Sequence, residues 1–260
     1  EGFGKIDIVS PFLEDVIYGE KNNFDDISMA LLAGDLIWSA PPKSRGKFME
    51  KIIKEIDANQ LNMSQLILSA NDISIEISKE TFKKNLLAVG ELNILYDEVL
   101  NNYTFSDIEK KGYRVIYSPL SEAMWMMWHD YSNQNRNDNS ILAEQRLDEL
   151  RVKMQSISKA LSEWSPFESS SLDLIQIADQ TLGYFSGAHG RYRQAKQLSK
   201  IPKVDGIITA ASIYENTGIV LGMLQKGFEN KDTKPVLNLT FDGNKNENDK
   251  MKIDSFIYYI

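Results

Sequence analysis

Four short apolar runs, each followed by a stretch with helical periodicity, limit the possible folds of this chain more than any other feature. The runs cover Asn85–Ile94, Tyr113–Pro119, Val204–Ser212 and Pro235–Asp242. Strands that alternate with helices are typical of a parallel sheet with helices on both faces. The sequence therefore predicts an α/β fold with a doubly wound, mostly parallel sheet of about four strands, in the order 2-1-3-4.

Apolar residues at helical spacing predict the remaining elements. Ahead of the first run we expect a short opening segment at Ile6–Val9 and a helix over Asp25–Ala40, capped by Asp25 or Asp26 and ended by Pro41-Pro42. The stretch LILSANDISIEIS is ambiguous and fits a helix end followed by a short strand. Further helices are predicted over Lys47–Ala58, Asp97–Lys111, Ser121–Tyr131, Ile141–Leu161, Leu172–Phe185, Gly190–Lys200, Gly218–Phe228 and Asp249–Ile260.

These elements suggest two regions. Residues 1–80 form a mainly helical N-terminal region, which would also fit the end of a preceding lobe. Residues 81–260 form an α/β lobe with a helical insertion at about 121–200, between the second and third strands. Ser121 is the expected N-cap of the first inserted helix, and Gly112 is a suitable residue to follow the helix before it.

Composition narrows the classes of function. The 260 residues include no cysteine, so this chain supplies no disulfide, thiolate nucleophile or cysteine ligand. Its two histidines, His129 and His189, lack a partner at metal-ligand spacing, and we expect no metal or other cofactor. A net charge of −8 argues against nucleic-acid binding. No apolar run has the length of a membrane span, and the start EGFGKIDIVSPF lacks a signal-peptide pattern, so we expect a cytoplasmic location without a membrane.

Polar residues follow each predicted strand, where a doubly wound sheet binds its ligands. With strand order 2-1-3-4, the crevice would lie between the first and third strands. Four carboxylates would converge there and could serve acid–base chemistry or a divalent cation, although strand-end turns and helix caps favour the same residue types. The predicted crevice residues are Glu91, Asn93, Ser118, Glu122, Ser212, Tyr214, Glu215, Asn216 and Asp242.

Three longer segments resemble a known family. They are VGELNILYDEVLNNYTFSDIEKKGYRVIYSPLSEAMW, KVDGIITAASIYENTGIVLGMLQ and KPVLNLTFDGNKNENDKMKIDSFIYYI. Their order and spacing are similar to those of the 2-hydroxyacyl-CoA dehydratase superfamily, in the branch of the CoA-substrate-specific enzyme activases, or acyl-CoA dehydratase activase-related proteins. The resemblance covers roughly Leu86 to Ile260, and more vaguely the helix at Met29–Trp38.

The resemblance implies paired α/β lobes and a [4Fe–4S] cluster that is held by cysteines and passes one electron to a 2-hydroxyacyl-CoA. This chain departs from the family at the decisive residue. The place of the family's cysteine falls at about Glu215, and Ser212-Ile213 stands where the family has Pro-Phe. Because iron–sulfur sites need sulfur ligands, we expect no [4Fe–4S] cluster ligated by this chain.

Two further segments have competing interpretations. In SGAHGRYRQAK, Arg191 and Arg193 could contact the phosphates of a CoA-like ligand, or the segment is a turn followed by a solvated basic helix. His189 is a candidate acid–base group in the same segment. In AMWMMWHDY, the methionines and tryptophans at 124–128 fit a core, an acyl pocket, or a surface for a protein partner or self-association.

Three functions fit these observations. The first is a cluster-free dehydratase-like domain that serves as a structural, regulatory or partner-binding subunit of a dehydratase/activase-type system. The second is a binding module or enzyme for an acyl-CoA or another anionic small molecule, which would use the strand-end carboxylates and Tyr214. The third, an unrelated periplasmic-type binding protein, is disfavoured by the lack of a signal-peptide pattern.

Overall fold

The sheet is the centre of one half of the molecule. The computed structural model describes residues 13–134, 140–168, 170–183, 189–199, 204–228, 234–244 and 247–260. The four strands are β1 (Asn85–Gly90), β2 (Arg114–Tyr117), β3 (Gly206–Ser212) and β4 (Val236–Phe241). They pair in parallel in the order β2-β1-β3-β4, so the predicted α/β fold and strand order are confirmed. The predicted segment Ile6–Val9 lies outside the described residues.

Helices cover both faces of the sheet, because strand side chains alternate between the faces and both sets are apolar. Leu86 and Ile208 are buried on one face, whereas Leu87 and Ile207 are buried on the other. The first face packs against α5 (Leu92–Tyr96), α6 (Thr104–Lys110) and α12 (Glu247–Tyr259). The second face is covered in part by α10 (Gly190–Leu198) and α11 (Asn216–Phe228).

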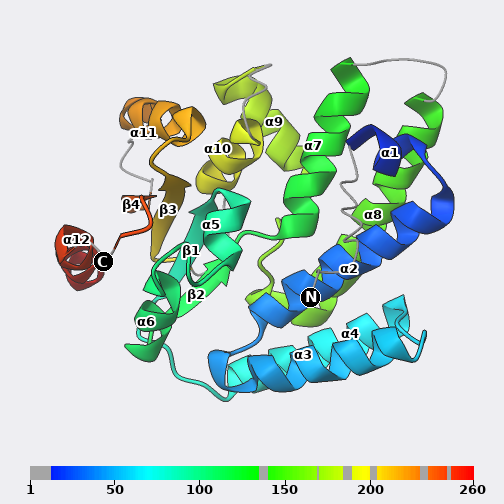
Figure 1. Ribbon diagram of the computed structural model, residues 1–260, viewed down its shortest axis with the longest axis horizontal. Helices are drawn as coiled ribbons and strands as arrows, with labels where there is room; N and C mark the ends of the chain where they lie inside the picture. The colour runs from blue at the N-terminus through cyan, green and yellow to red at the C-terminus, as the bar shows by residue number, and fades with distance from the viewer. Residues whose placement is uncertain are drawn as a thin grey trace, which may run out of the picture.

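The other half of the molecule is a layer of helices (Figure 1). Before the sheet the chain forms α1 (Leu13–Tyr18), α2 (Lys21–Ser39), α3 (Pro42–Asp57) and α4 (Met63–Ser78). The inserted segment forms α7 (Leu120–Gln134), α8 (Ser140–Leu161), the 3-10 turn Ser162–Trp164, and α9 (Ser171–Thr181). Residues from both groups, such as Leu36, Ile73, Trp128 and Leu150, share one hydrophobic core. The N-terminal helices and the insertion therefore stabilise each other.

The ambiguous stretch before the sheet is one helix, and the short strand expected at its end is wrong. In α4 the buried residues Leu66, Ala70, Ile73 and Ile77 recur at helical spacing. The side chain of Asn62 caps the helix by accepting hydrogen bonds from the backbone N–H groups of residues 64 and 65. The apolar face packs against α2 and α8, which favours the helix over a strand.

The segment after β1 also differs from the prediction. The strand ends at Gly90, and the predicted helix Asp97–Lys111 is reduced to α6. The carboxylate of Asp97 accepts hydrogen bonds from two following backbone N–H groups, which stabilises a turn instead of a helix. Tyr103 then takes a left-handed conformation with φ 60°, which interrupts the helix. Gly112 follows the helix with φ 89°, as predicted.

Two predicted helix caps are wrong. The helix predicted to start at Asp25 or Asp26 is α2, which begins at Lys21, so both aspartates lie inside it. The first inserted helix begins at Leu120, and Ser121 is its second residue. The free N–H groups at its N-terminus are bound by the buried carboxylate of Asp35, which belongs to α2. This carboxylate accepts hydrogen bonds from the N–H groups of Leu120 (2.6 Å) and Ser121 (3.0 Å) and from the Ser121 hydroxyl. A carboxylate at this position compensates the partial positive charge of the helix end.

Candidate functional site

The carboxyl ends of β1 and β3 meet at the point where the strand order reverses. Gly90 pairs with Ala210, and a Cβ atom at Gly90 would lie 2.0 Å from the Ala210 carbonyl oxygen. The backbone N–H of Glu91 donates to that same oxygen at 2.8 Å, and its carboxylate accepts from the Ser212 N–H at 2.9 Å. Only glycine permits this approach at position 90, and Glu91 joins the two strand ends.

An ion pair links the loop after β3 to α10. Both carboxylate oxygens of Glu215 accept hydrogen bonds from Nη1 of Arg193, at 2.5 and 2.7 Å. The Arg193 side chain is 2% exposed and that of Glu215 is 11% exposed, so the charges attract each other through a medium of low dielectric.

Gly218 allows α11 to approach this ion pair closely. A Cβ atom at position 218 would lie 2.6 Å from the Cβ of Ala211 on β3, and 3.3 Å from Nη2 of Arg193. A larger residue would push the first turn of α11 away from the sheet. The absence of a side chain at Gly218 thus lets the first turn of α11 pack directly against Ala211 and the guanidinium of Arg193.

His189 lies at the same strand ends. It is the N-cap residue of α10, with φ 49°, and its Nε2 is 3.3 Å from the Gly90 carbonyl oxygen. Since a carbonyl only accepts, this contact requires the proton on Nε2. Burial, with a smaller contribution from the positive charge of Arg193, lowers the pKa of His189 to about 4. The imidazole is therefore neutral at physiological pH and donates to the end of β1.

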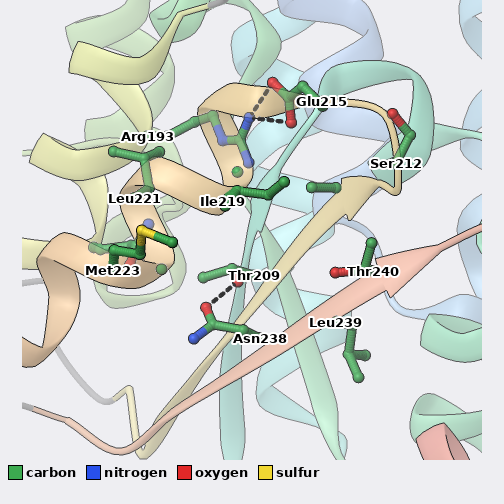
Figure 2. A pocket seen from close by; sticks show the side chains of 14 residues that line it. Arg193, Thr209, Ser212, Glu215, Ile219, Leu221, Met223, Asn238, Leu239 and Thr240 are labelled. Atoms are coloured by element: carbon green, nitrogen blue, oxygen red, sulfur yellow. Dashed lines mark hydrogen bonds and ion pairs between the residues drawn. The ribbon is translucent and has the colours of Figure 1, made fainter.

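A pocket of about 390 Å³ opens beside the ion pair, between α10, α11 and the strands β3 and β4. Figure 2 shows Arg193 and Glu215 facing each other at one end, and the hydrogen-bonded pair Thr209 and Asn238 on the strands. Apolar and polar groups both contribute to its surface. The lining residues used below are Arg193, Ala211, Ser212, Glu215, Gly218, Ile219, Leu221 and Met223.

The structure brings only some of the predicted crevice residues together. Glu91, Ser212 and Glu215 surround the ends of β1 and β3, as their hydrogen bonds show. Tyr214 is next to them, but its side chain is 91% exposed. Asn216 begins α11 and is exposed, and so is Asn93 in α5.

The other predicted crevice residues have structural contacts. Asp242 is exposed and accepts a hydrogen bond from the Asn244 N–H at 2.8 Å, which forms a turn after β4. Ser118, at the end of β2, is fully buried, and its backbone carbonyl accepts from the Tyr96 hydroxyl. Glu122 is 1% exposed and is paired with Lys196. The expected convergence of four carboxylates is thus reduced to Glu91 and Glu215.

The basic helix is buried, and the expectation of a solvated basic face is wrong. Arg191 pairs with Asp130 at 2.8 Å and Asp179 at 2.6 Å, and Lys196 pairs with Glu122. The structure places both predicted phosphate contacts, Arg191 and Arg193, beside carboxylates. Only Arg193 also lines the pocket. Gly187, which opens the predicted loop, lies outside the described residues.

The helix α7, which contains the methionines and tryptophans at 124–128, contributes to the core of the helical layer. Trp125, Met126 and Trp128 are buried, and the Trp125 indole donates to the Leu147 carbonyl at 2.8 Å. Trp128 packs on Phe24 with ring centroids 5.7 Å apart. These contacts favour the core interpretation over an acyl pocket, and they leave less of the helix surface for a partner than the sequence suggested.

The sequence analysis predicted neither the polar side chains of β4 that line the pocket nor the ion pair between Arg193 and Glu215. Asn238 and Thr240 alternate with Leu237 and Leu239 on β4, and this period-two pattern could have indicated one polar strand face. His189 is the N-cap residue of α10 and Arg193 lies in its first turn, so both are near the start of this helix. No local signal indicated that Arg193 would pair with Glu215.

Comparison with family models, curated proteins and solved structures gave no match. Within the described ranges, no cluster of three or more potential metal-ligating side chains is present, and every helix is too short or too polar to span a bilayer. The function of the site therefore has to be argued from its geometry.

Proposed function

We propose that this chain is an α/β binding module that holds a small anionic molecule in the pocket between α10, α11 and the strands β3 and β4. The observation that supports this most is a buried arginine that lines the pocket and is balanced by a single carboxylate from a loop. A guanidinium out of water needs an anion, and its planar donors suit carboxylate or phosphate. The end of the pocket at Ser212 and Glu215 lies at the carboxyl end of β3, the sheet edge at which doubly wound folds bind their ligands.

The remaining lining supports a ligand with an apolar part. Leu221 and Ala211 are buried beside the cation, and Ile219 and Met223 lie at the rim with exposed surface. Binding pockets commonly combine an apolar lining with a few polar groups that orient the ligand. An acyl-CoA would fit this proposal if its acyl or phosphate end entered the pocket and the rest lay outside, since about 390 Å³ is small for the whole molecule.

Calorimetric titration with anionic ligands, including CoA esters, tests this proposal. We expect saturable binding by the wild-type chain and a loss of at least roughly tenfold in affinity for Arg193→Lys, which keeps the charge but loses the planar donors. Arg151→Lys is the matched control, because Arg151 pairs with Asp148 on α8 far from the pocket lining. The absence of heat and of thermal shift up to millimolar ligand would contradict the proposal.

We also propose, as a second function, a cluster-free subunit of a dehydratase/activase-type system. This proposal is supported by exposed apolar residues at or next to the pocket rim. Met223 in the lining is 70% exposed, and Ile213 and Tyr214, which lie between the lining residues Ser212 and Glu215 in the chain, are 46% and 91% exposed. A partner that covers this rim would also enclose the pocket. Because the chain has no cysteine, such a partner would have to supply the cluster ligands. Iron and sulfide analysis of the anaerobically purified chain is the test, and a stoichiometric cluster would overturn it.

A further inference from the structure

The ion pair between Arg193 and Glu215 uses only one of the guanidinium nitrogens, Nη1. Both oxygens of Glu215 contact the single nitrogen Nη1, rather than two nitrogens side by side. Two parallel hydrogen bonds from different nitrogens are the stronger arrangement for arginine and a carboxylate. Within the described part of the chain, the hydrogen bonds of the Arg193 side chain go to Glu215 alone. A second carboxylate in the pocket could therefore make a better pair than the resident one.

The free edge of the guanidinium faces the pocket. Nη2 of Arg193 is 3.3 Å from the point where a Cβ atom of residue 218 would be, and Gly218 lines the pocket. Oε2 of Glu215 is also 3.3 Å from that point, so an anion that reached Arg193 from the pocket would compete directly with the resident carboxylate. The buried Leu221 and Ala211 lie next to this position, so the atoms behind the anionic group would contact apolar surface.

The loop that carries Glu215 has few other attachments. Its backbone hydrogen bonds are from Ile213 to the Phe241 carbonyl at 3.0 Å and from Glu215 to the Ser212 carbonyl at 3.1 Å. The side chains of Ile213 and Tyr214 are 46% and 91% exposed. Release of Glu215 into solvent therefore costs mainly its contacts with Arg193, which an incoming carboxylate replaces.

We infer that Glu215 is an internal substitute for the ligand, and that the ligand is a small carboxylate with a short aliphatic chain, which displaces Glu215 from Arg193. This inference rests on the proposed binding function and gives it a ligand class. The volume, near the lower end of the roughly 300–1,000 Å³ usual for ligand pockets, suits such a molecule. No covalent step is involved, because one carboxylate exchanges for another on the same cation.

Calorimetry with hexanoate, hexanamide and inorganic phosphate tests the inference on the full chain. We expect wild type to bind hexanoate but not hexanamide, and Glu215→Gln to bind hexanoate on the order of tenfold more tightly, because the competing charge is gone. Glu215→Gln keeps an oxygen that can accept a hydrogen bond from Arg193, so the fold is expected to persist. Circular dichroism of each variant checks this.

The outcomes separate the two levels of the proposal. Equal or weaker binding of hexanoate by Glu215→Gln, with wild-type binding intact, would overturn displacement but keep the binding module. Tighter binding of phosphate than of hexanoate would overturn the ligand class. If neither wild type nor the variant bound any of the anions, the proposed function itself would fail. If the Glu215→Gln variant has a low Tm, the rise in Tm on adding hexanoate is compared between the variant and wild type. A larger rise in the variant would support displacement, and an equal rise would contradict it.

Discussion

At the residue scale, buried charges hold α10 in place. Lys196 and Glu122 are 0% and 1% exposed, and Nζ of Lys196 is 2.5 Å from a Glu122 oxygen. The same ammonium donates to the Pro166 carbonyl, and the Glu122 carboxylate also accepts from Tyr192 and from the Glu168 N–H. Buried ions of this kind are tolerated only when their hydrogen-bonding capacity is largely filled. The pair therefore specifies how α10 docks on α7.

We predict that Lys196→Met lowers the free energy of unfolding by about 3–5 kcal/mol, because it leaves Glu122 charged and without its cation. Lys79→Met, which removes an exposed i,i+3 pair with Glu76, should cost less than about 1 kcal/mol. Urea denaturation of both variants measures the difference. Similar losses in the two variants would show that the buried pair has no special role.

A second residue-scale prediction concerns Asp35. Burial raises the pKa of its carboxyl to about 7, although hydrogen bonds from Ser121 and Leu120 act in the opposite direction. The folded pKa lies above the unfolded value of about 3.8, so protonation favours the fold, and this contribution is lost as the pH rises from about 4 to 7.

Between pH 5 and pH 8, wild type should therefore lose on the order of 2 kcal/mol of unfolding free energy relative to Asp35→Asn, whose side chain does not titrate. Urea denaturation at the two pH values gives the slope for each protein. The comparison uses the slopes alone, since asparagine also changes the hydrogen bonds at the start of α7. Parallel pH dependences would contradict the prediction.

At the element scale, the position of α11 depends on small residues that face the strands. Gly218 and Gly222 are one helical turn apart on this helix and both line the pocket. Their surroundings differ, because a Cβ atom at 218 would overlap Ala211 whereas one at 222 would lie 4.0 Å from its nearest neighbour, Nδ2 of Asn238. The two glycines thus form a matched pair for testing close packing.

We predict that Gly218→Ala destabilises the protein by about 1–3 kcal/mol, since α11 or β3 must shift to admit the methyl group. Gly222→Ala should stabilise it by up to about 1 kcal/mol, because alanine is the better helix former and space is available. Thermal denaturation of the two variants is the measurement. A stabilised Gly218→Ala variant would show that α11 is not held against β3 as described.

At the scale of the whole molecule, the helical layer and the sheet are joined by specific contacts. Trp38 of α2 packs on Tyr117 of β2 with ring centroids 4.8 Å apart, and Arg45 lies over the same indole and pairs with Glu109 of α6. Arg114 at the start of β2 donates to the Trp164 carbonyl at 2.9 Å. These contacts join α2, α3 and the turn at Trp164 to β2 and α6 of the sheet region.

We therefore predict a single cooperative unfolding transition. The four tryptophans of the chain report on the helical layer and its border with the sheet, whereas far-UV circular dichroism reports on all helices and strands. Urea transitions followed by the two signals should coincide, as expected for two-state unfolding. Two separated midpoints would show that the layer and the sheet unfold as independent units.

Much of the fold could be predicted because its signals are local. An apolar strand such as Ile207–Ala211, or the spaced apolar residues of α8, indicates its own structure within about ten residues. Alternation of strands and helices then leaves few topologies, and the parallel order β2-β1-β3-β4 is among them. Two predictions failed for different reasons. At Leu66–Ser78 packing against α2 and α8 decides between helix and strand, and at Asp97–Tyr103 a polar side chain and a positive φ decide between helix and turn.

The sequence by itself determined the class of fold, the strand order and the absence of thiolate chemistry. Only the tertiary structure decided which charges meet. Arg193 and Glu215 are 22 positions apart, Lys196 and Glu122 are 74 apart, and Asp35 and Ser121 are 86 apart. Electrostatic pairing depends on distance through space and on burial, neither of which has a local pattern along the chain. The carboxyl end of β3 was therefore predictable as one border of the candidate site, whereas the pocket itself, with a buried arginine between α10, α11, β3 and β4, became visible only after the chain was folded.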